Sequence, residues 1–163
     1  LLEFASSIMS LLLAGKVGSN IASEIGSMRI TEQIDALEIM GVNSANYLIL
    51  PKVIGLVLCM PLLVTFSVFC GLIGGTGVAY FTDLIPVADF IYGIQYAFIP
   101  YYFTYSIIKS LFFGFIIASI SAFYGYYAYG GALNVGKAST NAVVNSSIVI
   151  LLMNIVLTQL LLV

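Results

Sequence analysis

Glu3 and Lys109 are charged side chains that stand inside long apolar runs of this sequence. A charge held in apolar surroundings is expensive, and it is kept where it is paired or where it faces a polar cavity. Lys109 lies too deep in its run for its long side chain to reach water easily. We therefore expect Lys109 to face such a cavity or to pair with an acid. Glu3 is on the same ground a candidate functional residue, and the alternative is a residue at a helix end that reaches water.

Catalytic chemistry by this chain itself is not expected. The sequence has no histidine, which removes the commonest general base and the commonest metal ligand. It also has no nucleotide-binding loop of the form G-x-x-x-x-G-K-[ST], so ATP hydrolysis is not expected here. The residues predict a non-catalytic chain with no metal site and no cofactor of its own.

The composition predicts which elements hold these charges. The chain is 61% hydrophobic and only 7% charged, whereas soluble domains have about 25% charged residues. Most of the chain must therefore lie in lipid. Four apolar stretches are long enough to cross a bilayer as helices, and they cover about residues 1–25, 51–80, 98–127 and 142–163. Because they show no apolar–polar alternation, barrel strands are excluded, and we predict one all-α transmembrane bundle over 1–163.

The basic residues place the connections between these stretches, because Lys and Arg collect in cytoplasmic loops. Those that flank or lie in the first and third connections are Lys16, Arg29, Lys52 and Lys137. The first connection and the third, 127–141, are therefore predicted to be cytoplasmic, and the second, 81–97, extracytoplasmic. Since Leu1 already lies in an apolar run, we expect the sequence to be truncated at its N-terminus and to begin within a helix, with a fifth span in the full chain.

The first connection contains a short amphipathic segment over about residues 30–40. Apolar side chains recur there at helical spacing, at Ile30, Ile34 and Leu37. Acidic side chains recur every three residues, at Glu32, Asp35 and Glu38. Thr31 is the expected N-cap and Gly41 the expected stop, and Pro51 is expected at the start of the next helix.

The acidic face of this segment indicates a protein partner. The alternative is a helix that rests on the membrane surface. It is less favoured, because such helices are usually rich in Lys and Arg. The acidic face would suit a basic groove on a cytosolic partner. The net charge of the chain is −2 and no basic stripe occurs, so nucleic acid is not an expected partner.

Five motifs follow one another along nearly the whole chain. They read AGKVG at 14–18, EIGSMR at 24–29, TEQIDALEIMGV at 31–42, KSLFFG at 109–114 and GKASTNAVVNSS at 136–147. In order and spacing they closely resemble the MlaE family of permeases. Glu3 aligns with a glutamate of that family in an L-R-E-x-G-P motif, of which this chain keeps only the leucine and the glutamate.

The resemblance implies the permease subunit of an ABC transporter that moves phospholipid or a related lipid. Expected partners are a second copy of the chain, a cytosolic ATPase that binds ATP and Mg²⁺, an MCE-domain substrate-binding protein and, in some members, a STAS-domain subunit. The segment at 30–40 would be the coupling helix. The coupling residues that it implies, with the last acid of the stripe, are Glu32, Gln33, Asp35, Ala36, Leu37 and Glu38. The expected location is a bacterial inner membrane, or a plastid envelope.

The resemblance also implies where lipid would be bound. The family's glutamate lies near the lipid cavity, so Glu3 is a site residue, and Lys109 would hold a phosphate or balance Glu3. Tyr105 belongs to the tyrosines at the ends of the third stretch, which are typical of anchors at the membrane interface, and it could still touch lipid. Asn154 stands where several members carry Asp, and it keeps hydrogen bonding without the charge. Candidate lipid-binding residues are therefore Glu3, Tyr105, Lys109 and Asn154.

Two other functions remain as alternatives. The run from Asp35 to Pro51 faintly echoes the E-A-A…G…L-P loop of permeases that import small solutes. Such import needs a polar path, whereas these stretches are very apolar. An integral membrane enzyme acting on lipid would gather several Asp, Glu, His or Lys side chains on one face, and Glu3 and Lys109 are at most an isolated pair.

Overall fold

The computed structural model describes residues 2–82, 86–97 and 99–162, and the regular structure in these ranges is helical. The elements in chain order are α1 (Leu2–Leu13), the π-helix η1 (Ala14–Gly18), α2 (Ser19–Ile30), α3 (Gln33–Ile39), α4 (Ser44–Thr82), α5 (Val87–Ala97), α6 (Pro100–Tyr126) and α7 (Ala132–Leu162). The all-α prediction is thus confirmed. Asp83, part of the second predicted connection, lies outside the described residues.

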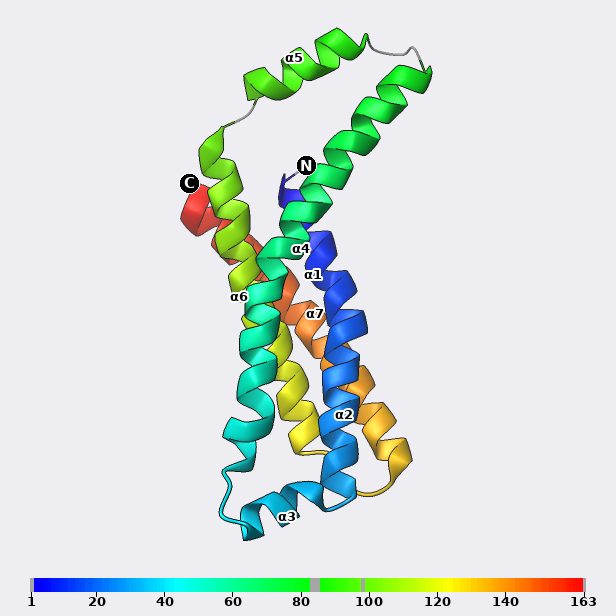
Figure 1. Ribbon diagram of the computed structural model, residues 1–163, viewed down its shortest axis with the longest axis vertical. Coiled ribbons are helices and arrows are strands. Elements are labelled where there is room, and N and C mark those ends of the chain that lie inside the picture. The colour runs from blue at the N-terminus through cyan, green and yellow to red at the C-terminus, as the bar shows by residue number, and fades with distance from the viewer. Residues whose placement is uncertain (1, 83–85, 98, 163) are drawn as a thin grey trace.

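The helices form an elongated bundle with a short helix at each end (Figure 1). The series α1, η1 and α2 runs along the bundle beside α4, α6 and α7. Helix α3 closes one end, between α2 and α4, and α5 lies across the other end, between α4 and α6. The two chain ends both lie toward the α5 end. Residues from the start and the finish of the sequence therefore meet in that half of the bundle.

Three of the described helices are long and apolar enough to cross a membrane: α4, α6 and α7, the last over Ala132–Leu161. Helix α4 has 39 residues and is about 58 Å long at 1.5 Å per residue. That is well beyond the roughly 30 Å of a bilayer's hydrocarbon core. The first predicted span, 1–25, lies in the helical series α1–η1–α2, which η1 divides into two helices of 12 residues each.

Helix α6 is the most buried of the three long helices, and glycines let its neighbours approach it. A Cβ atom on Gly125 would lie 2.8 Å from the backbone oxygen of Ala22 in α2. A Cβ on Gly114 would lie 3.2 Å from the backbone oxygen of Leu56 in α4. Close backbone approach of this kind is how helices associate where hydrophobic burial cannot drive them together. The core thus forms around α6 from α2 on one side and α4 on the other.

The π-helix η1 is a widened turn held by hydroxyl groups. Ser19 Oγ donates to the carbonyl of Gly15 at 2.5 Å, and Ser139 Oγ of α7 donates to the carbonyl of Ser19 at 3.0 Å. Gly18 faces Ser121 of α6, whose Oγ would lie 2.8 Å from an added Cβ. One carbonyl of η1 and the first carbonyl of α2 thus accept hydrogen bonds from side-chain hydroxyls.

The start of α3 differs from the prediction, whereas its end is confirmed. The N-cap position is Glu32 in the left-handed conformation (φ 60°), and Thr31 Oγ1 instead donates back to the carbonyl of Ser27 at 2.9 Å. Thr31 is therefore wrong as the cap, because α3 begins one residue later than a cap at Thr31 requires. At the other end Gly41 has φ 78°, and the amide of Val42 donates to the carbonyl of Leu37. These are features of a Schellman stop.

Helices α4 and α7 both begin earlier than predicted. Asn43 caps α4, since its Oδ1 accepts from the amide of Asn46 at 3.2 Å. Pro51 therefore lies inside α4 rather than at its start. Residues from Ala132 onward are helical, so most of the loop predicted over 127–141 is the first part of α7. The two helix starts were predicted too late, because polar residues occur in the first turns of helices as well as in loops.

Candidate functional site

A cluster of four polar side chains joins three helices in the half of the bundle that carries the chain ends. Its members are Glu3 of α1, Tyr105 and Lys109 of α6, and Thr158 of α7. Lys109 Nζ lies 2.5 Å from Glu3 Oε1. The Lys109 side chain is fully buried, whereas 43% of the Glu3 side chain is exposed. The expectation that Lys109 pairs with an acid is thus confirmed, and that acid is Glu3.

Helical spacing brings these side chains to one place. Tyr105 and Lys109 are four residues apart, so they share one face of α6. The phenol oxygen of Tyr105 accepts from Lys109 Nζ at 2.9 Å and lies 3.3 Å from Glu3 Oε1, to which it donates. Thr158 Oγ1 lies 2.9 Å from Glu3 Oε1 and 2.7 Å from the carbonyl of Asn154. Its single proton can serve only one of these two acceptors at a time.

All three ammonium hydrogens of Lys109 have acceptors within the chain. Nζ donates to Glu3 Oε1 at 2.5 Å, to Tyr105 OH at 2.9 Å and to Thr158 Oγ1 at 3.2 Å. An ammonium group has three donors and no more. The rings of Tyr105 and Phe113 lie 5.0 and 5.9 Å from Nζ and add cation–π attraction. Lys109 therefore acts here as the buried half of an ion pair.

Asn154 lies one helical turn before Thr158 and is tied to α1. Its Oδ1 accepts from Ser7 Oγ at 2.9 Å. Asn154 thus stands next to the Glu3–Lys109 pair, and it is linked to that pair through Thr158. The sequence reasoning missed Thr158. The available signal was its spacing of four residues from Asn154, which predicts that both polar groups share one face of an apolar helix.

At the opposite end, α3 turns its apolar side inward. Ile34 is fully buried and Leu37 packs against the core. The other predicted coupling residues are exposed: Glu32, Gln33, Asp35, Ala36 and Glu38. Beyond them, Ile39 is 87% exposed and Met40 is also exposed. The outer face of α3 is therefore partly apolar as well as acidic.

Two of the acids on α3 have partners within the chain. Asp35 Oδ1 forms a 2.7 Å ion pair with Arg29 of α2. Glu38 Oε1 accepts from Ser44 Oγ at 2.8 Å and from Tyr126 OH at 3.0 Å. The hydroxyls of Ser44 and Tyr126 lower the pKa of the Glu38 carboxyl below its ordinary value, with a smaller contribution from Arg29. These contacts fix α3 against α2, α4 and α6.

A comparison with known proteins places the chain in a family. The model of the family "Permease MlaE" matches residues 1–160. The chain belongs to the MlaE permease family. A relative from Rickettsia bellii, named a probable ABC transporter permease protein, is 40% identical over 158 residues, which are 97% of this chain and 61% of the relative. This permease chain thus spans about three fifths of the length of that relative.

Further MlaE relatives come from photosynthetic organisms. The probable ABC transporter permease protein slr1045 of Synechocystis is 38% identical over 159 residues, 97% of this chain and 60% of the relative. The chloroplastic protein TRIGALACTOSYLDIACYLGLYCEROL 1 of Arabidopsis thaliana is 34% identical over 166 residues, 96% of this chain and 45% of the relative.

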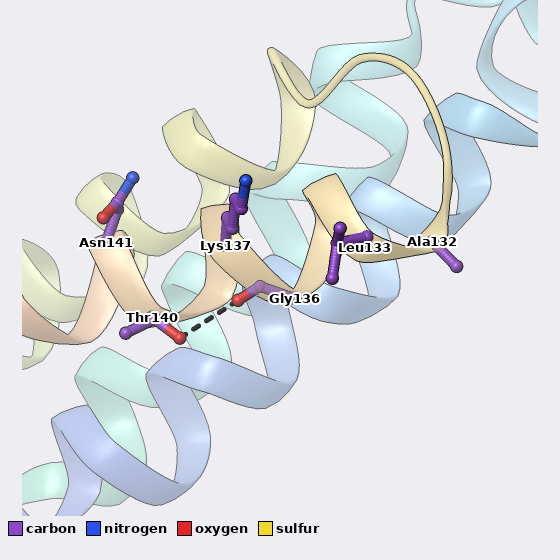
Figure 2. Close-up of a pocket in the computed structure, with 6 residues that line it drawn as sticks. All are labelled: Ala132, Leu133, Gly136, Lys137, Thr140 and Asn141. Atoms are coloured by element: carbon purple, nitrogen blue, oxygen red, sulfur yellow. Dashed lines mark hydrogen bonds between the residues drawn. The ribbon is translucent and has the colours of Figure 1, made fainter.

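The MlaE permease chain also has a surface pocket of about 570 Å³ at the start of α7 (Figure 2). Its lining comes from that one helix: Ala132, Leu133, Gly136, Lys137, Thr140 and Asn141. The run from Gly131 to Ala138 differs from a nucleotide-binding loop only by Ala at its last position. Because the backbone is helical from Ala132 onward, its amides do not form a phosphate-binding loop. Figure 2 shows the hydroxyl of Thr140 bonded to the carbonyl of Gly136.

Proposed function

We propose that this chain is the permease subunit of an ABC transporter that moves phospholipid or a related lipid. The observation that carries the proposal is the Glu3–Lys109 ion pair, with one partner fully buried and the other half-exposed, inside a bundle whose outer surface is apolar. An amphiphile needs a path with apolar walls and a few polar groups for its head. The name of the Arabidopsis relative, which is that of a galactolipid, supports a lipid substrate.

The proposed membrane arrangement has four spans in this chain. They are α1–η1–α2 taken as one span, then α4, α6 and α7. Helix α3 and the α6–α7 connection would lie in the cytoplasm, because the basic residues gather there, and α5 would lie on the other side. The membrane would be the inner membrane of a bacterium or the envelope of a plastid, in keeping with the sources of the relatives.

The energy of ATP hydrolysis would reach the membrane spans through α3, which would act as the coupling helix. A partner ATPase would bind ATP and Mg²⁺ and would receive the outer face of α3, with Glu32, Gln33 and Ala36 together with the exposed Ile39. Asp35 and Glu38 would act mainly through Arg29 and Tyr126, holding α3 rigid against the bundle. A rigid helix of this kind can pass ATPase closure to the spans that it connects.

The proposed transporter contains further subunits. A second copy of the chain would form the permease dimer, and an MCE-domain protein would receive or deliver lipid on the far side. A STAS-domain subunit is a further proposed partner. Membership of the MlaE permease family supports these proposals.

Mass spectrometry of lipids that copurify with the intact full-length transporter tests the proposal. We expect stoichiometric phospholipid with wild type, and ATP-driven lipid transfer after reconstitution. Absence of phospholipid above the detergent background, together with uptake of a small solute, would instead identify an importer of small solutes.

A further inference from the structure

The hydrogen bonds of Glu3 are unevenly divided between its two carboxylate oxygens. Lys109 Nζ, Tyr105 OH and Thr158 Oγ1 all bond to Oε1. Among the described residues, no hydrogen bond or ion pair to Oε2 is found. A carboxylate offers about four acceptor positions over its two oxygens. The Glu3 side chain is 43% exposed, and Oε2 is therefore the oxygen that has acceptor positions left for a ligand.

Lys109 does not offer a comparable site for an anion. Its side chain is fully buried, and its three donors are used by Glu3, Tyr105 and Thr158. A lipid phosphate could bind Nζ only by displacing one of these acceptors from a buried cation, which is costly. The part of the ion pair that a ligand can reach is thus the anionic part.

We propose that Glu3 Oε2 accepts a hydrogen bond from the primary ammonium of a phospholipid head group of the ethanolamine type. This inference rests on the proposed lipid function and adds the class of head group to it. A primary ammonium supplies both positive charge and N–H donors, and charge-assisted hydrogen bonds are the strong ones. A quaternary choline has charge but no N–H donor, and a phosphoglycerol head has hydroxyl donors but a net negative charge.

The low-dielectric surroundings strengthen this discrimination. Phe4, next to Glu3, is exposed and apolar, and the neighbouring face of α1 carries Ile8 and Leu12. A charged group in such a place interacts more strongly than it would in water. One charge-assisted hydrogen bond in this setting corresponds to a preference of about tenfold.

The experiment reconstitutes the full-length transporter into vesicles of equal parts phosphatidylethanolamine, phosphatidylglycerol and phosphatidylcholine. Bound lipid is then quantified after extraction. We expect the ratio of ethanolamine lipid to each of the other two lipids to be about tenfold higher in the lipid bound to wild type than in the vesicle. Glu3→Gln should bring the bound ratio back to that of the vesicle. Asp89→Asn removes an exposed carboxylate on α5, outside the cluster, and should behave as wild type.

Two further variants keep the test decisive if Glu3→Gln fails to assemble. Glu3→Gln with Lys109→Met leaves no unpaired charge in the cluster and should also lose the preference. Lys109→Met alone leaves the carboxylate unneutralised and should keep or increase the preference. Equal ratios in wild type and in the Glu3 variants, with phospholipid still bound, would overturn the inference and leave the lipid function standing. Absence of bound phospholipid in wild type would overturn the lipid function itself.

Discussion

The two ends of the bundle each contain an ion pair, and the pairs differ in burial and in sequence separation. Glu3 and Lys109 are 106 residues apart, and the lysine is fully buried. Arg29 and Asp35 are six residues apart, with side chains 35% and 51% exposed. Exposed pairs contribute about 0–1 kcal/mol to stability, whereas removal of one partner from a buried pair costs about 3–5 kcal/mol. The first pair thus forms only when the bundle is assembled, whereas the second depends on a local turn.

The largest expected effect comes from breaking the buried pair. Glu3→Ala should lower the free energy of unfolding by about 3 kcal/mol, because Lys109 then stays buried without its counter-charge. Thermal unfolding of the purified transporter in detergent measures this loss. Arg29→Ala is the matched change at the other end and should cost less than about 1 kcal/mol. Equal losses for the two variants would contradict the contrast between the ends.

The next effect concerns helix packing near the α3 end, where α2 and α6 approach each other closely at Gly125. Gly125→Ala places a methyl group 2.8 Å from the backbone oxygen of Ala22, so α2 and α6 must separate. Overpacking of this kind costs about 1–3 kcal/mol, measured by the same unfolding assay. Gly55→Ala is the control, because a Cβ there meets no atom within 4 Å. A neutral Gly125→Ala would mean that α2 and α6 are not close-packed.

The third effect tests the α3 end for coupling rather than for stability. Charge reversal at Glu32 and Asp35 together should reduce ATP-driven lipid transfer by about tenfold or more, equivalent to about 1.4 kcal/mol, while the bundle remains folded. The measurement compares ATP hydrolysis with lipid transfer in reconstituted vesicles. Asp89→Lys, on α5 at the opposite end, should leave both unchanged. Undiminished transfer by the double variant would exclude this face of α3 from coupling.

The smallest expected effect is a pH dependence of the contacts that stabilise α3 against the bundle. Hydrogen bonds from Ser44 and Tyr126 lower the pKa of Glu38. A lowered pKa in the folded state gives stability that is present above the unfolded pKa and is lost as pH falls through the folded pKa. Amide exchange in α3 should therefore accelerate in acid below the ordinary range of a glutamate. Glu38→Gln should remove that acid-dependent step, and an unchanged acid profile in this variant would contradict the assignment.

The two ends also differ in how far the sequence predicts them. The α3 helix and its Gly41 stop could be predicted because both depend on neighbours in the chain, through helical periodicity and a left-handed residue. The Thr31 cap was predicted wrongly, because Glu32 takes the N-cap position in the left-handed conformation and α3 begins one residue later. The candidate residues Glu3, Lys109 and Tyr105 were named from their types and from the family motifs.

What the sequence could not provide was the arrangement between distant segments. That Thr158 joins Glu3 and Lys109 depends on the rotation of α7 against α1 and α6, which no local pattern determines. The division of bonds between the two oxygens of Glu3 likewise exists only in the assembled bundle. Helix starts at Ser44 and Ala132 were missed because polar residues in a first turn look like loop residues.

The π-helix η1 sets the rotational phase between α1 and α2. A π-turn holds about one residue more than an α-turn, and one residue corresponds to about 100° of rotation around a helix axis. Glu3 lies on one side of η1 and the connection to α3 on the other. If residues 14–18 tightened into an ordinary α-turn while α2 stayed packed on Gly125, Glu3 would turn away from Lys109. One widened turn in the middle of the series α1–η1–α2 thus sets how the cluster around Glu3 is oriented relative to the α3 end of the bundle.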